Sequence, residues 1–146
     1  MHKAASKILF DAAVAKLSGR LLELRDWKLN SSEFPVLDIT FGTSAPDRAF
    51  RARFTFDEWD DLPPSVCFLT TAGDPARSVP RDPKGVINTG NHPVTGLPFV
   101  CSIGFREYHT HTSHVTDHWS NYRGKPGYDI GDLVTKLWQA WKKAVK

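Results

Sequence analysis

The residues best suited to chemistry lie in the second half of the chain, and Cys101 is the first of them. It ends a short apolar stretch after a loop rich in proline and glycine, so its sulfur is a candidate nucleophile that is partly open to solvent. The thiolate is the reactive form of cysteine, and neighbouring histidines would generate or stabilise it. Most free cysteines are instead small buried side chains, and that alternative stays open for Cys101. Cys67, between Val66 and Phe68, is predicted to fill the core.

A polar group follows Cys101 closely. Four of the six histidines fall within ten positions, together with two carboxylates; the group is Glu107, His109, His111, His114, Asp117 and His118. Cys101 with Glu107, His109 and His114 would supply the ligand types of a zinc site. The same histidines would serve equally as proton carriers around Cys101, because histidine titrates near neutral pH. A third interpretation is a polar surface loop whose histidines form only local hydrogen bonds.

A small mixed domain has to position these groups. The 146 residues, 40% of them hydrophobic, are enough for one globular domain spanning residues 1–146. Apolar residues recur at helical spacing over residues 3–18, whereas residues 34–41, 50–56 and 66–70 favour strands, which predicts an antiparallel meander. Residues 72–98 are rich in proline and glycine and predict a long irregular crossover. A last helix is predicted after Asp129, which can cap it.

Composition narrows the functional classes. The apolar runs are far shorter than the roughly 20 residues that a membrane helix needs, and no secretory signal opens the chain, so no membrane association is expected. Two cysteines are too few to stabilise a domain of this size through disulfide bonds, which favours a reducing, cytoplasmic setting. The formal net charge of +3 comes without a basic run, so no nucleic acid partner is expected.

The segment over residues 54–101 resembles the ubiquitin-conjugating enzyme family. In that family a proline pair precedes a Val-x-Phe-x-Thr strand, and here Pro63 and Pro64 precede Val-Cys-Phe-Leu-Thr at residues 66–70. The interval from His92 to Cys101 is similar to the family's interval from His-Pro-Asn to the catalytic cysteine. Residues 101–119 also look like bacterial members of ubiquitin-like conjugation operons. The order of basic helix, meander, crossover, cysteine and final helix follows the family as well.

The resemblance implies a fold and a reaction. The fold would be a ubiquitin-conjugating-like α/β (α+β) domain with an N-terminal helix, a meander of about four strands, a long active-site crossover and a C-terminal helix. A ubiquitin-like protein would pass from an activating enzyme to Cys101 as a thioester, and an amine of a target protein would then attack it. His109, His111, His114 or Asp117 would accept the proton of that amine. A role in bacterial antiviral defence is implied by the resemblance alone.

Two features of the family need a substitute in this chain. The family places an oxyanion donor just after His-Pro, where this sequence has Val94; Asn91 is the predicted replacement, with Asn88 or a later histidine as alternatives. The Tyr-Pro step is absent too. For the activating enzyme, the resemblance implies docking on the basic first helix through lysines, although a solvated helix face explains the same residues. These lysines are Lys3, Lys7 and Lys16.

Two rival functions remain from the sequence. Domains described as metal-binding through a Cys, Glu, His, His set also resemble residues 101–119, so the alternative is a zinc-binding domain without acyl transfer. It would use Cys101, Glu107 and the cluster from His109 to His118. The two functions make opposite demands on the sulfur, because a structural zinc would cap the thiolate. The second rival is an inactive, carrier-type domain that only binds a partner. The conjugating function itself needs no cofactor.

Overall fold

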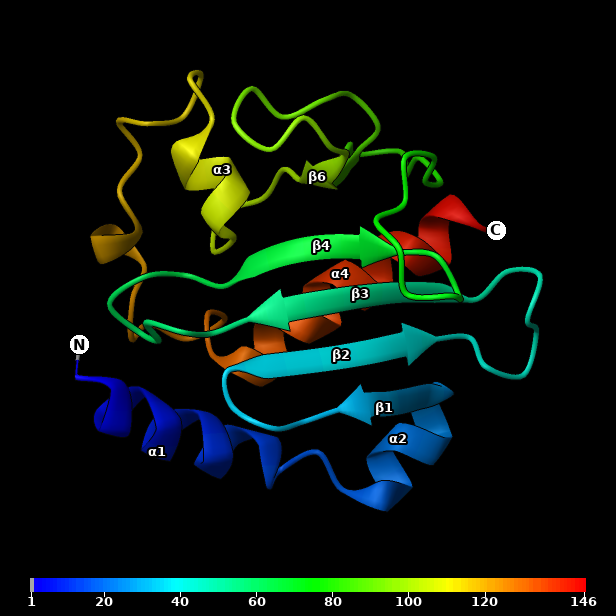
Figure 1. The fold of residues 1–146 in the computed structure, drawn as a ribbon, viewed down its shortest axis with the longest axis horizontal. Helices are drawn as coiled ribbons and strands as arrows, with labels where there is room; N and C mark the ends of the chain where they lie inside the picture. Colours follow the sequence, from blue (N-terminus) through cyan, green and yellow to red (C-terminus); the bar gives the residue numbers. More distant parts are fainter. Residues whose placement is uncertain (1) are drawn as a thin grey trace.

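A four-stranded antiparallel sheet lies at the centre of the computed structural model, which describes residues 2–146. Its strands keep their chain order in space, β1-β2-β3-β4. The elements are α1 (Lys3–Val14), α2 (Gly19–Arg25), β1 (Trp27–Ser31), β2 (Val36–Phe41), β3 (Phe50–Thr55), β4 (Ser65–Leu69), β5 (Ile87–Asn88), β6 (Phe99–Val100), α3 (Arg106–Thr110), the 3-10 turn η1 (Trp119–Asn121) and α4 (Ile130–Ala144). In Figure 1, α4 crosses behind the sheet, and α3 and β6 lie beyond its β4 edge.

The core forms between one face of the sheet and the apolar face of α4. Side chains alternate between the two faces of a strand, and in β3 Phe50, Ala52 and Phe54 are buried while the residues between them are partly exposed. The buried residues of α4 recur every three or four positions: Ile130, Leu133, Val134, Leu137, Ala140 and Trp141. Burying one such large side chain is worth roughly 1.5–3 kcal/mol, so this contact dominates the stability of the fold.

The last helix begins where the sequence predicts. The Asp129 carboxylate accepts a hydrogen bond from the backbone N–H of Asp132 at 2.7 Å, and the Asp132 carboxylate accepts one from the N–H of Asp129 at 3.3 Å. This reciprocal pair satisfies two donors that a helix N-terminus otherwise leaves free. Lys142 and Lys143 lie in the last turn, at the negative end of the helix dipole.

The first helix is shorter than its apolar pattern predicts. It ends at Val14 rather than near Ser18, and a second helix, α2, begins at Gly19. The Ser18 hydroxyl oxygen accepts a hydrogen bond from the N–H of Leu21 at 3.2 Å, which caps this second helix. A serine at this position starts a new helix more readily than it continues an old one, because its side chain competes for backbone donors.

Cys67 does not fill the core, and this corrects the expectation from sequence. Its neighbours Val66 and Phe68 are buried, so the pleat turns Cys67 to the opposite face of β4, where it lies partly exposed beside Arg53 of β3. Burial still raises the pKa of the Cys67 thiol, although the nearby Arg53 charge lowers it in part. This cysteine therefore sits on the open face of the sheet, away from α4.

The long crossover contains one short ordered ribbon. Strand β5 lies within residues 72–98 and pairs in antiparallel register with β6, which follows that segment directly; Ile87 is opposite Val100 and Asn88 is opposite Phe99. The rest of the crossover is irregular, as the sequence predicts. The predicted α+β class is confirmed, with its N-terminal helix, four-strand antiparallel meander and C-terminal helix, in a layout consistent with a ubiquitin-conjugating-like fold. Over residues 2–146, every helix is too short or too polar to cross a membrane.

Candidate active site

Cys101 lies directly after β6, where the β5–β6 ribbon fixes its backbone. Its N–H donates to the carbonyl oxygen of Val86 at 2.8 Å, which extends the ladder by one position. Asn88 is then a diagonal neighbour of Cys101 on the same face of the ribbon, within reach of its side chain. The Asn88 side chain hydrogen-bonds the Cys101 sulfur, and the sulfur is also 4.0 Å from Nε2 of His114. Three side chains from separate segments thus meet at one partly exposed thiol.

The environment of Cys101 keeps the thiol protonated at neutral pH. Partial burial raises the pKa of this thiol, and the hydrogen bond from Asn88 lowers it only in part. A thiol of this kind is a weak nucleophile until a base removes its proton. His114 is the histidine whose ring nitrogen reaches the sulfur, so it is the base that this geometry provides.

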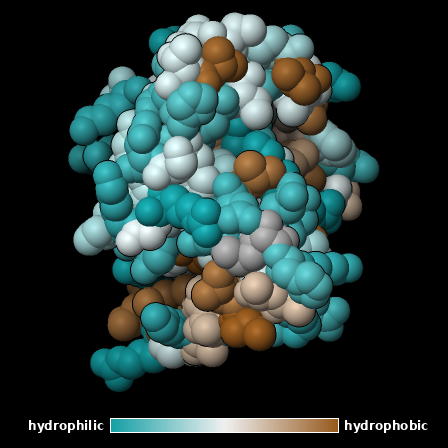
Figure 2. Space-filling model, turned by 90° about the vertical axis from the view of Figure 1, so that its left-hand side faces the viewer, coloured by the Kyte–Doolittle hydropathy of each residue, from teal (hydrophilic) through white to brown (hydrophobic). Residues whose placement is uncertain are grey.

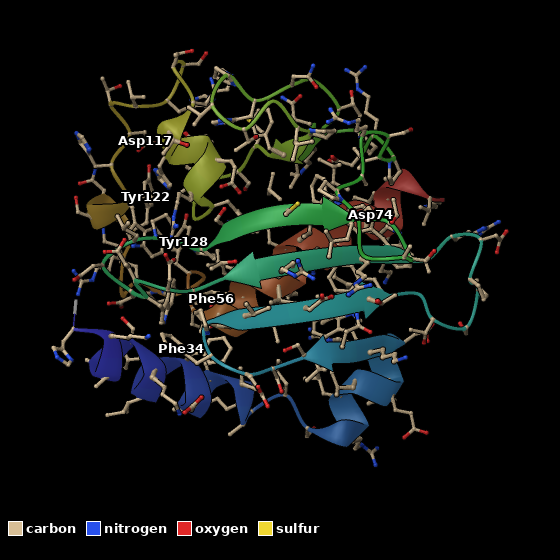
Figure 3. The ribbon with its side chains drawn as sticks, viewed as in Figure 1. Phe34, Phe56, Asp74, Asp117, Tyr122 and Tyr128 are labelled. Atoms are coloured by element: carbon tan, nitrogen blue, oxygen red, sulfur yellow. The ribbon has the colours of Figure 1, made fainter. Side chains whose placement is uncertain are left out.

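His114 is held by an aromatic stack and a carboxylate behind it. The Tyr108 ring lies parallel to the His114 ring, with centroids 4.2 Å apart and planes 13° apart. The Tyr108 hydroxyl donates to Oδ2 of Asp117 at 2.7 Å, and the Tyr122 hydroxyl donates to Oδ1 at 2.7 Å. Figure 3 shows Asp117 above Tyr122, on the same side of the molecule as α3. The two tyrosines were not singled out from the sequence, because only the turn over residues 111–118 brings them to Asp117.

Asp117 anchors two tyrosine hydroxyls. Hydrogen bonds from Tyr108 and then Tyr122 lower the pKa of Asp117, which favours its ionised form at neutral pH and makes it a weaker base. The same contact with Asp117 raises the pKa of Tyr108 to about 12. Asp117 thus anchors the tyrosine that stacks on His114, and its acceptance of a proton in the reaction stays a prediction.

His109 is occupied at both ring nitrogens. Nε2 accepts the backbone N–H of Gly104 at 3.1 Å, which leaves the proton on Nδ1, 2.6 Å from the carbonyl oxygen of Asp117. Burial lowers the pKa of His109, which favours this neutral form. The ring joins α3 to the segments before and after it. His109 is thus a structural residue here, and the prediction that it carries protons does not fit its contacts.

The ring of His111 lies next to the ring of His114. It stacks on Phe99, with centroids 5.6 Å apart, and its centroid is 5.9 Å from that of His114. Its Nδ1 accepts the N–H of Ser113 at 3.1 Å. His118 is exposed just before η1. Of the four clustered histidines, one therefore contacts the sulfur, one packs behind it and two lie further along the loop or in the scaffold.

His92 and Asn91 are adjacent in the sequence, but the His92 side chain is buried and the Asn91 side chain is exposed. His92 is 1% exposed; its Nδ1 accepts the N–H of Val94 at 3.1 Å, and its Nε2 donates to the carbonyl oxygen of Glu107 at 2.8 Å. It ties the crossover to α3. Asn91 is exposed, and Val94 is 77% exposed. The asparagine that contacts Cys101 is Asn88, which the sequence offered only as the alternative to Asn91.

The alternative metal ligands are not brought together. Glu107 is 4% exposed and turned toward β4, where Oε1 accepts the N–H of Val66 at 2.6 Å and Oε2 accepts the hydroxyl of Ser65 at 2.9 Å. Both ring nitrogens of His109 are engaged elsewhere. Among residues 2–146, no three His, Cys, Asp or Glu side chains group so that they could hold a metal ion. The set of Cys101, Glu107, His109 and His114 is therefore split by the fold.

Neither the models of known protein families nor the curated protein sequences match this chain.

Proposed function

We propose that this protein is a ubiquitin-conjugating-like transferase, which carries a ubiquitin-like protein as a thioester on Cys101 and transfers it to an amine of a target protein. The observation that supports it best is the partly exposed Cys101 sulfur, in contact with both a ring nitrogen of His114 and the amide of Asn88. An α+β layout consistent with a ubiquitin-conjugating-like fold agrees with this role. Fold alone does not decide function, so the proposal rests on the site.

In the loading step, the activating enzyme presents the ubiquitin-like protein as a thioester. His114 takes the proton of the Cys101 thiol, and the sulfur attacks the thioester carbonyl carbon. The bond from that carbon to the sulfur of the activating enzyme breaks, and its departing thiolate takes up the proton from His114. One thioester replaces another, so the step needs no oxidant or reductant.

In the transfer step, a neutral amine of the target attacks the carbonyl carbon on Cys101. His114 accepts the proton that the amine gives up, and the Cys101 thiolate leaves as the amide forms. The oxyanion between these events needs a hydrogen-bond donor. Oδ1 of Asn88 accepts the N–H of Gly90 at 2.8 Å, which turns the NH2 group of Asn88 the other way, and that group is the proposed donor.

We place the contact with the activating enzyme on α1. Figure 2 shows apolar side chains gathered at the lower end of one side of the molecule, where α1 lies, and Ile8 and Leu9 of this helix are 70% and 42% exposed. Lys3 is exposed on the same helix and Lys16 is exposed just after its end, whereas Lys7 pairs with Asp11. Such lysines would mainly raise the rate of association with an acidic face.

The test is formation of a thiol-sensitive adduct. The protein is incubated with the activating enzyme, ATP and the ubiquitin-like protein, and analysed on a non-reducing gel. We expect an adduct that reductant removes, that Cys101→Ala abolishes and that Cys67→Ala retains. An adduct that survives Cys101→Ala, or none from wild-type protein beside a fully loaded activating enzyme, would overturn the proposal.

A further inference from the structure

A cleft of about 850 Å³ lies between the C-terminal end of α4, the end of α2 and the loop that joins β2 to β3. These elements lie toward the right-hand end of Figure 1, whereas α3 of the Cys101 site lies at the upper left. The cleft shares no lining residue with the site around Cys101. Its charged side chains are Arg25, Arg48, Lys142, Lys143, Lys146 and Asp26.

The formal net positive charge of the chain is concentrated in the residues that line this cleft. Removing its five cations and one carboxylate from the 19 and 16 of the sequence leaves 14 and 15, so the remaining side chains carry a net charge of −1. In the described part of the chain, none of the five cations is in an ion pair. Asp26, the one carboxylate, accepts hydrogen bonds from Thr43 and Ser44 instead, and these lower the pKa of Asp26.

Aromatic rings hold two of the cations in place. The Arg25 guanidinium lies 5.0 Å from the ring centre of Trp27 and 4.9 Å from that of Trp138, and it donates to the Thr135 hydroxyl at 2.8 Å. Nζ of Lys142 lies 4.4 Å from the ring centre of Trp138. Contacts of this kind limit the motion of a charged side chain, so less entropy is lost when an anion binds. The field of the helix C-terminus offsets only about half of one charge.

We infer that this cationic cleft binds an extended acidic segment of a partner polypeptide. Carboxylates match the unpaired cations in charge, and a concave cleft of this size accepts a single extended chain. Single-stranded nucleic acid needs open aromatic faces for base stacking, and two cations already lie over the Trp138 ring. The inference does not depend on the proposed chemistry at Cys101.

The first measurement is fluorescence anisotropy of a labelled deca-glutamate peptide with the whole chain. We expect saturable binding that weakens with salt, and a loss of at least about tenfold in affinity for the double variant Lys142→Glu, Lys143→Glu. The matched control is Arg77→Glu with Lys84→Glu, which changes the net charge equally at exposed positions outside the cleft. It is expected to retain affinity within about twofold.

Further variants and competing ligands distinguish acidic peptide binding from misfolding, from the chemistry at Cys101 and from binding to nucleic acid or membranes. If the double glutamate variant is not folded by circular dichroism, Lys142→Gln with Lys143→Gln replaces it, with an expected loss of about threefold or more. Cys101→Ala is expected to bind the peptide as wild-type protein does, so a failed thioester assay leaves this result standing. Equal weakening by the control variant, no saturable binding at low salt, or tighter binding of deca-thymidine or phosphatidylserine vesicles would each overturn the inference.

Discussion

The ring of Tyr108 lies flat against the ring of His114, 4.2 Å away, while its hydroxyl is anchored on Asp117. This relationship makes Tyr108 the residue that orients the proposed base toward Cys101. Tyr108→Ala is expected to slow discharge of the thioester to free lysine by about tenfold, because the base loses its alignment. Tyr108→Phe keeps the stack and is expected to stay within about threefold of wild type. Single-turnover discharge measures both, and an alanine variant as fast as wild type would refute a positioning role.

Asn88 provides the second prediction. If its amide stabilises the oxyanion, Asn88→Ala is expected to lower the rate of transfer by about 10²-fold, the usual loss for one such donor. Asn91→Ala is the matched control, because Asn91 is exposed in the loop that follows β5, and the rate of this variant should stay unchanged. The comparison uses thioester discharge at saturating amine. Equal losses in the two variants would remove the oxyanion role from Asn88.

The pH dependence of thiol reactivity provides the third prediction. Burial raises the pKa of Cys101, so its thiolate fraction at pH 7 is below that of a cysteine in a short peptide. Iodoacetamide should therefore alkylate Cys101 slowly at pH 7 and faster as the pH rises past the usual thiol range. Asn88→Ala removes the hydrogen bond that lowers the pKa, so its alkylation profile should shift to still higher pH. Mass spectrometry of the Cys101 peptide follows both, and a profile shifted to lower pH than the peptide's would contradict this account.

Glu107 provides a prediction about stability. Burial raises the pKa of Glu107, so the fold favours its protonated form, and its contribution to stability is complete below the unfolded pKa and lost as pH rises through the folded one. Glu107→Gln keeps an acceptor for the N–H of Val66 without a charge. Wild-type protein should therefore lose stability relative to the glutamine variant as the pH rises from about 4 to 7. Glu107→Ala should cost about 1–3 kcal/mol, because it leaves the Val66 N–H unpaired.

Denaturant unfolding at several pH values checks these expectations for Glu107. A difference between wild type and Glu107→Gln that does not change with pH would show that this carboxyl does not titrate differently in the folded state.

Gly42 and Gly85 provide a matched pair for a packing prediction. Both have positive φ, +74° and +71°, but a Cβ on Gly42 would lie 2.6 Å from the Trp141 ring, whereas Gly85 faces open space. Gly85→Ala is expected to cost about 1 kcal/mol from backbone strain alone. Gly42→Ala is expected to cost about 1–3 kcal/mol more, because the ring is buried and cannot move freely. Thermal unfolding of the two variants gives the difference, and equal costs would mean that the Trp141 contact is not tight.

Local pattern was enough to predict most of the scaffold. The helical spacing of residues 130–144 with a cap at Asp129, and the alternation in β3, follow from short-range geometry and are confirmed. The same rule of alternation, applied to β4, places Cys67 opposite its buried neighbours Val66 and Phe68, so its open position was also available from the sequence.

Local sequence pattern could not predict which of the candidate side chains contacts the Cys101 sulfur. His109, His111 and His114 belong to a helix end and an irregular turn, which have no period that fixes the direction of a side chain. Only the folded turn shows that His114 reaches the sulfur while both nitrogens of His109 are used in the scaffold.

By itself, the sequence determined the α+β class, the first and last helices, three of the four strands of the meander and the sulfur to examine, because these depend on periodicity and residue type within short stretches. The tertiary structure alone decided that Asn88 rather than Asn91 contacts Cys101, that Asp117 accepts hydrogen bonds from tyrosines, and that Glu107 of α3 hydrogen-bonds to β4. Each of these contacts joins residues on different elements, and the free energy that selects them comes from burial of the whole core and pairing of its polar groups.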